Sequence, residues 1–347
     1  MIRNKTLFVI GAGAGFDIDM PLGSKLSDVI GKKLDIKFDF SKQISGDSEI
    51  VEALRRKADA EKIDVNQYRQ AGVNVSRGIG YTRSIDSYLN AHSGDEHIKV
   101  CAKIAVVHTI LEHEKQSALF IDHSKSPLEF HGRAKVMDSW FSALMYLLTE
   151  GIKKNENLEK IFDKVAFVNF NYDRCLEQFL WLALQQLYLV TEERAAQLIS
   201  GLTIIHPYGV VGGLPWHGGL RIPYGKKLDA QALLLAAENI RTFNEQIEDK
   251  EMLKTLGDEV SAAERIIFLG SHYHQQNMDL LKAALPARGG SVSVYGTSCG
   301  RSGSDKEIIQ DQVRALLEPR GGEWRLLVDN GLDCTGLFKE FGTAWGR

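Results

Sequence analysis

Short apolar runs that end abruptly in a glycine or a polar side chain recur along this chain of 347 residues. They lie at 5–10, 164–168, 202–205, 265–269, 291–295 and 324–328. Each run suits one buried strand, and segments with apolar residues at helical spacing separate most of them. These helices are expected at 175–190, 230–247, 277–285 and 306–317. Because strands that alternate with helices form a parallel sheet covered on both faces, the sequence predicts an α/β fold with a Rossmann-like, doubly wound sheet.

The pattern changes between residues 46 and 160, where helix-forming residues dominate. Apolar residues recur at helical spacing in 98–111 and 137–148, and 49–63 is charged and helical. The chain is long enough for one large core or two modest ones. We therefore predict a helical insertion module at 46–160, set into a core made of residues 1–45 and 161–347. The apolar positions of this module are expected to form a core rather than an oligomer surface.

Composition excludes several classes of protein. Lys and Arg number 42 against 45 Asp and Glu, a formal charge of -3, so the chain lacks the basic excess of a protein that coats nucleic acid. No apolar run approaches the roughly 18–20 residues that cross a bilayer, and no export signal is visible. The four cysteines are too scattered for CxxC pairs, so neither a zinc ribbon nor a disulfide framework is expected. These features predict a cytoplasmic protein without direct nucleic-acid or membrane binding.

The first strand runs into the glycine-rich segment Gly11-Ala12-Gly13-Ala14-Gly15. Glycines in such a turn let a phosphate approach the backbone and leave bare N–H groups to bind it. Phe16 takes the place of the last glycine of GxGxxG, so the dehydrogenase fingerprint is not met. A nucleotide loop and a mere tight turn are equally compatible with this segment alone.

Polar residues also follow the next strands, at the sheet edge where ligands bind in α/β proteins. Asn171 and Asp173 come after the second strand and His206 ends the third. A histidine at this place can act as a general base. The plain alternatives are a helix N-cap for the first two and a structural histidine for the third. Taken singly, each alternative is the more common case.

Two further strand ends carry small polar pairs, Gly270-Ser271 and Gly296-Thr297, which suit close approach by a ribose or phosphate. The adjacent His272 and His274 lack a nearby third ligand and predict no metal site. Several strand ends of this kind converge on one sheet edge. That convergence favours a nucleotide site over separate structural explanations.

The order of these motifs resembles the sirtuin family. The resemblance rests on Gly11-Ala12-Gly13 followed by Pro21, on Asn171 and Asp173 after the second strand, on His206, and on Gly270-Ser271. It is closer still to the bacterial sirtuin-like proteins of anti-phage defence. The segments that carry this closer likeness are 84–89, 170–177, 206–209 and 268–273, with Asn277.

The resemblance implies an NAD hydrolase that cleaves the nicotinamide-ribose bond and depletes NAD in infected cells. It implies that Asn171 holds the nicotinamide ribose and an attacking water, that His206 is the base, and that Asp173 accepts the nicotinamide amide N–H. It also implies a homo-oligomer, with a HerA-type translocase or an Argonaute-like protein as partner. The NAD-binding residues carried over are Gly11, Ala12, Gly13, Gly15, Pro21, Tyr172, Gly270, Ser271, Asn277, Gly296 and Thr297.

The sequence departs from the deacylase branch of that family. The two CxxC pairs of the zinc module are missing, and the Asp-Phe-Arg after the proline reads Leu22-Gly23-Ser24. Protein deacylation is therefore disfavoured, and a subunit that binds NAD or ADP-ribose without turnover is the main alternative. His131 and His217 stand in literal His-Gly pairs, but neither ends an apolar strand, so His206 is preferred.

Overall fold

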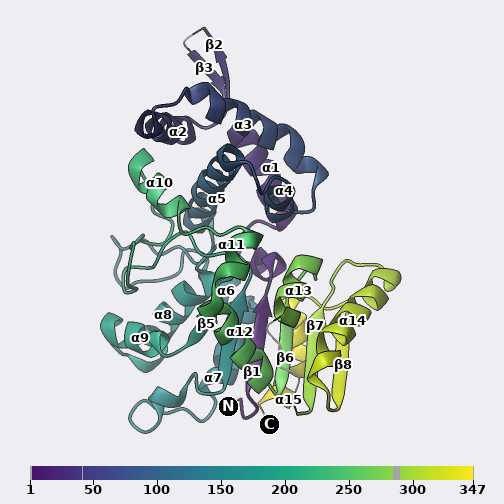
Figure 1. Ribbon diagram of the computed structural model, residues 1–347. Helices are drawn as coiled ribbons and strands as arrows, with labels where there is room; N and C mark the ends of the chain where they lie inside the picture. Colours follow the sequence, from purple (N-terminus) through teal and green to yellow (C-terminus); the bar gives the residue numbers. More distant parts are fainter. Residues whose placement is uncertain (1, 41, 284–289, 347) are drawn as a thin grey trace.

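The fold is built on a parallel sheet of six strands in the order β5-β4-β1-β6-β7-β8. The computed structural model describes residues 2–40, 42–283 and 290–346 (Figure 1). The strands are β1 (Thr6–Ile10), β4 (Val165–Asn169), β5 (Thr203–Ile205), β6 (Arg265–Leu269), β7 (Val292–Thr297) and β8 (Trp324–Asp329). Every expected strand is present, and the order is that of a Rossmann-like doubly wound sheet. From β1 the chain adds β4 and β5 on one side, and it then adds β6, β7 and β8 on the other side. The switch point therefore lies between β1 and β6.

Helices cover both faces of the sheet because successive side chains of each buried strand point to opposite sides. Leu7 and Val9 of β1 belong to one core cluster, and Phe8 and Ile10 belong to the other. The first face is covered by α12 (Lys250–Ala262), α13 (Gln275–Ala283) and α14 (Gly303–Leu317). The second is covered by α7 (Trp140–Thr149), α8 (Cys175–Tyr188), α9 (Glu192–Ser200) and α15 (Cys334–Trp345), with the short α6 (Arg133–Asp138) beside α7. Both apolar faces of the sheet are thereby buried.

A second group of helices stands over the carboxyl ends of the strands (Figure 1). It comprises α1 (Gly23–Leu34), α2 (Ser48–Glu61), α3 (Val65–Gly78), α4 (Ile85–Ala91), α5 (Glu96–Gln116) and α10 (Ala230–Ala237). Its central helix is α5, which is buried on nearly all sides at positions such as Ile104, Val106 and Val107. The hairpin of β2 (Lys37–Asp39) and β3 (Lys42–Ser45) extends from this group away from the sheet (Figure 1).

This group does not coincide with residues 46–160. Helix α1 precedes that range and packs on α3 and α5, while α10 follows it and packs on α2 and α5. Helix α7 lies inside the range but packs on α15 against the sheet. The expected boundaries at 45 and 160 therefore cut across the packing groups, because packing follows apolar faces rather than order along the chain.

The helix expected at 230–247 is broken into α10 and α11 (Phe243–Glu248). Between them Ile240 bridges to Gly209, the Arg241 amide donates to the Tyr208 carbonyl at 2.9 Å, and Thr242 begins α11 with a capping box. The helix expected at 277–285 is α13, and the last two residues of that prediction lie outside the described part. Short 3-10 turns complete the chain at η1 (Ala12–Ile18), η2 (Ile79–Tyr81), η3 (Leu158–Lys160) and η4 (Glu318–Arg320).

Candidate functional site at the carboxyl edge

A cavity opens at the switch point, between the loops that follow β1 and β6 and the helices that stand over them. With its mouth it holds about 1050 Å³ of empty space. The residues predicted from sequence that line it are Gly11, Ala12, Pro21, Asn171, Tyr172, Asp173, Ser271 and Asn277. These come from separate parts of the chain and meet because parallel strands end at one edge. Gly13, Gly15, Gly270, Gly296, Thr297 and His206 are absent from its lining.

Asn171 lies at the end of β4 and spans the gap to the first strand. Its backbone amide donates to the Asn169 side-chain oxygen at 3.0 Å, and its side-chain Nδ2 donates to the Gly11 carbonyl at 3.2 Å. The second bond joins the segments that follow two neighbouring strands, β1 and β4, and holds the amide group at the cavity wall. Because the amide group is planar, this bond also fixes the direction of the side-chain oxygen.

His206 lies beside Asn171 but is set behind the wall. Its Nε2 is 2.9 Å from Oε1 of Glu177, and the exposed fractions of these side chains are 10% and 6%. Nδ1 is also buried, makes no well-formed hydrogen bond among the described residues, and lies by the Asn171 backbone. Burial disfavours the charged imidazole, but the Glu177 charge and hydrogen bond outweigh it and raise the pKa of His206. The same pairing lowers the pKa of Glu177 against its burial.

Asp173 serves the start of α8 as well as the cavity. Its Oδ1 accepts a hydrogen bond from the Cys175 amide at 3.1 Å and so satisfies a free N–H group at the helix start, although the N-cap residue of α8 is Arg174 rather than Asn171 or Asp173. Burial raises the pKa of this carboxyl, and the nearby charges of Glu114 and Glu177 act in the same direction. The carboxyl group remains part of the cavity lining, so both interpretations apply to one residue.

The glycines of the first loop serve close packing between two loops. Gly11 and Gly13 donate their amides to the carbonyls of Leu269 and Gly270, each at 2.9 Å. A Cβ on Gly11 would lie 2.7 Å from the Gly270 carbonyl oxygen, and one on Gly270, at φ +58°, would lie 2.0 Å from the Ala14 nitrogen. The expectation that both amides are bare donors for a phosphate is therefore wrong, because the β6 loop uses them.

The other strand-end glycines also have packing partners. A Cβ on Gly15 would meet the Met20 side chain at 2.7 Å, and one on Gly296 would meet the Tyr273 hydroxyl at 2.3 Å. Thr297 accepts the Gly270 amide on its Oγ1 at 3.1 Å and so supports the β6 loop from behind. None of the three residues lines the cavity, and an NAD-binding role for Gly15, Gly296 and Thr297 stays a prediction.

Several lining residues went unassigned in the sequence analysis. Tyr172 donates a short hydrogen bond to Asp86, and burial raises the pKa of Asp86 to about 6. The Tyr208 hydroxyl donates to Asn277 Oδ1 at 2.8 Å. Arg83, Ser84, His272 and His274 also line the cavity. Asp86 lies in the segment 84–89 that carries the family likeness, which was the available signal for it. Glu177 lies in the segment 170–177 and had the same signal, but its burial against His206 is set by tertiary packing and could not be predicted.

A buried ion pair anchors the segment that carries Asn171 and Asp173. Arg174 contacts Glu114 through Nε at 3.0 Å and Nη2 at 2.5 Å, and both side chains are almost fully enclosed. Arg174 Nη1 also donates to the carbonyls of Gly212 and Ile222. The pair therefore ties the start of α8 to α5 and to the long loop after β5.

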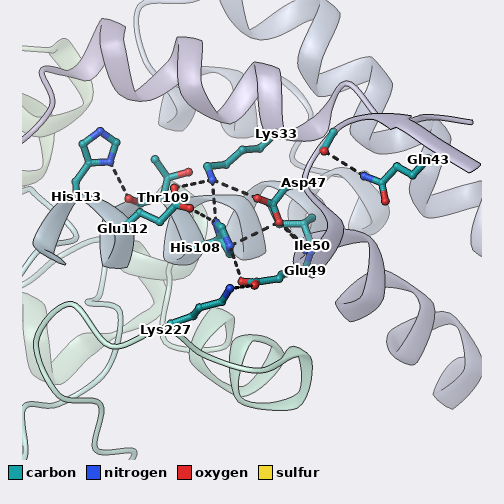
Figure 2. Close-up of polar contacts among 11 residues, drawn as sticks. Lys33, Gln43, Asp47, Glu49, Ile50, His108, Thr109, Glu112, His113 and Lys227 are labelled. Atoms are coloured by element: carbon teal, nitrogen blue, oxygen red, sulfur yellow. Dashed lines mark hydrogen bonds and ion pairs between the residues drawn. The ribbon is translucent and has the colours of Figure 1, made fainter. Parts of the chain in front are cut away.

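A separate cluster of charged residues joins α1, α2 and α5 (Figure 2). Asp47, His108 and Glu112 offer ligand atoms that lie within 4.8 Å of one another. The Lys33 ammonium group lies among them, 3.4 Å from Asp47 Oδ2, 3.0 Å from His108 Nδ1 and 2.7 Å from Glu112 Oε2. Because a lysine already balances these carboxylates, the cluster carries no metal assignment. The prediction that the protein needs no metal stays a prediction.

No family model, curated protein or solved structure matches this chain. The class that the fold and cavity define is therefore a Rossmann-like α/β protein with a cavity at its switch point. In the described ranges, none of the helices combines the length and apolar character needed to cross a bilayer.

Proposed function

We propose that the chain is an NAD hydrolase that cleaves the nicotinamide-ribose bond to give ADP-ribose and nicotinamide, and that it depletes NAD in anti-phage defence. One observation carries the proposal. Asn171 and Asp173 line the switch-point cavity, and the pair of His206 and Glu177 lies beside the Asn171 backbone. Ligands of doubly wound sheets bind at this place, and a histidine paired with a buried carboxylate is a usual device for proton transfer.

The proposed reaction needs a placed nucleophile more than an acid. As the C1′–N bond breaks, its electron pair leaves with neutral nicotinamide and the ribose passes through an oxocarbenium-like state. Asn171 orients the ribose and the attacking water, whose oxygen forms the new bond to C1′. The proton of that water, or of a ribose hydroxyl, passes to His206. Asp173 accepts the nicotinamide amide N–H and turns the ring away from the ribose.

Glu177 acts in this scheme through His206 as a positioning residue. Its carboxylate fixes the ring orientation and stabilises the imidazolium that forms on proton uptake, as the raised pKa of His206 indicates. A positioned base contributes about 10²–10⁴ in rate. Because His206 is not on the cavity wall, the proton reaches Nδ1 through a water beside Asn171 or after a shift of that segment.

The test uses chromatography to measure how fast the purified chain releases nicotinamide from NAD. We expect Asn171→Ala and His206→Ala each to lower release at least about 10²-fold. The matched controls are Asn90→Ala and His131→Ala, two exposed residues outside the cavity, which should keep wild-type turnover. Full turnover by both site variants would refute the assignment, and loss in His131→Ala would move the base to the other histidine.

A binding subunit without turnover is the second candidate. The position of His206 behind the cavity wall favours it, because a pure binding site needs no base in contact with the ligand. Binding of NAD with no nicotinamide release by the wild-type chain, alone and with its partner, would select this function. A homo-oligomer, a HerA-type or Argonaute-like partner and a cytoplasmic location complete the proposal.

A further inference from the structure

The turn after β6 presents two histidines on one side and buries the tyrosine between them. Tyr273 adopts a left-handed conformation at φ +51°, and its hydroxyl donates to the Thr297 carbonyl at 3.1 Å. His272 and His274 therefore point the other way, with their rings stacked at 5.8 Å and an interplanar angle of 13°. The strained backbone thus fixes two imidazoles side by side at the cavity mouth.

Two arginines from distant segments join these histidines. Arg301, in the loop after β7, contacts His272 Nδ1 through Nη2 at 2.7 Å, so this ring nitrogen accepts the hydrogen bond. Arg83 precedes α4 and lies close enough to His274 to affect its titration. Among residues that the structure describes, no carboxylate forms an ion pair with Arg83 or Arg301. We call Arg83, His272, His274 and Arg301 the Arg-His rim.

The Arg-His rim separates the switch-point cavity from a second hollow. Arg83, His272 and His274 line both spaces. The second hollow continues along α14, where its wall is formed by Ile308, Ile309 and Gln312 together with Asp305. Asp305 is occupied at the start of α14 in a capping box with Ser302. The two spaces thus form one trough with the Arg-His rim at its middle.

The switch-point cavity and the middle of this trough differ in charge. Asp86 and Asp173 lie in the switch-point cavity, whereas the middle holds cationic and imidazole groups without a paired anion. Burial lowers the pKa of both histidines, and neighbouring positive charge lowers it further, to about 4 for His274. The positive charge at this place comes from the guanidinium groups of Arg83 and Arg301, and an anion would offset their mutual repulsion. A dinucleotide with a cationic nicotinamide at one end and a diphosphate in its middle has the matching pattern.

We propose that the Arg-His rim, rather than the glycine loop, binds the diphosphate of the dinucleotide, and that the hollow along α14 takes the adenosine. This inference rests on the proposed function for the position of the nicotinamide half. In this inference the Arg-His rim, and not the glycine amides, supplies the hydrogen-bond donors to the phosphate groups. The Gly11 and Gly13 amides already donate to the β6 loop. Guanidinium groups suit this role because they donate two parallel hydrogen bonds to phosphate oxygens.

The experiment measures binding of ADP, which contains the adenosine and diphosphate but no nicotinamide, by calorimetry on the full chain. We expect Arg83→Gln and Arg301→Gln each to weaken ADP binding at least about tenfold, because each loses a charge-assisted contact. Arg314→Gln is the matched control. It makes the same change on α14, but its side chain pairs with Asp311 and lines neither space, so it should bind ADP like the wild type.

Both rim arginines are exposed, and unchanged thermal unfolding of the variants would show that folding is intact. No ADP binding by the wild type, or equal binding by the variants, would overturn the inference. Nicotinamide release with an unchanged KM for NAD in both variants would reject the rim while leaving the proposed hydrolase in place. Arginine-dependent ADP binding without nicotinamide release would support the rim and reject the hydrolase.

Discussion

The buried pair of Glu114 and Arg174 offers a sharp test of how the site is held. The carboxylate of Glu114 accepts two contacts from the guanidinium and one from the Gly225 amide at 2.9 Å. The exposed fractions are 0% for Glu114 and 1% for Arg174, so neither charge can be solvated by water. Glu114→Gln keeps the side-chain shape but removes the counter-charge and turns an N–H group toward the guanidinium.

We expect Glu114→Gln to lower the free energy of unfolding by about 3–5 kcal/mol, because it leaves a buried charge without its partner. The comparison is Arg314 with Asp311, a pair with the same 2.5 Å contact whose side chains are 50% and 73% exposed. Asp311→Asn should cost about 0–1 kcal/mol, since water solvates both groups. The contact distances are equal but the burial is not. We therefore expect Glu114→Gln to lose several times more stability than Asp311→Asn.

The assay is urea unfolding of the two single variants and of a double variant, Glu114→Gln with Arg174→Met. In the double variant neither charge of this pair remains, so most of the lost stability should return. Similar losses in Glu114→Gln and Asp311→Asn would refute the argument that burial decides the energy. A double variant no more stable than Glu114→Gln would show that the arginine is not the source of the penalty.

Two further predictions concern the residues around the cavity. Glu177→Gln removes the charge that raises the pKa of His206, so the base loses its proton at lower pH and the acid limb of kcat/KM for NAD should move to lower pH. A merely structural role would lower the rate and leave that limb in place. Gly270→Ala should destabilise the fold by more than the roughly 1–2 kcal/mol of a left-handed alanine, because its Cβ would lie 2.0 Å from the Ala14 nitrogen. Gly300→Ala, at φ +74° with open space around it, should show only the smaller loss in the same unfolding assay.

The strands were predictable because buried parallel strands leave a local signal. In the run 265–269 the four residues after Arg265 are apolar and a glycine follows, so its strand state can be predicted without knowledge of distant residues. The helix at 230–247 shows the limit of that approach. Its apolar pattern continues through Ile240, but the backbone there bridges to Gly209, and no local pattern reveals a partner so far along the chain.

Only part of the candidate site, likewise, could be predicted from the sequence. Parallel pairing alone brings the residues after β1, β4 and β6 to one edge, so Asn171, Asp173 and Ser271 could be placed together from sequence. Sequence could not reveal that the Gly11 and Gly13 amides are already occupied, because their acceptors lie on β6 and in the loop after it.

Sequence alone thus determined the strands, their parallel sense and the edge at which polar residues gather, since these depend on local apolar patterns and on chain connectivity. Only the tertiary structure decided that Glu177 pairs with His206 behind the wall and that Arg83 and Arg301 meet at the mouth. Those residues come from separate elements, and their burial and charge environment arise only when the elements pack together.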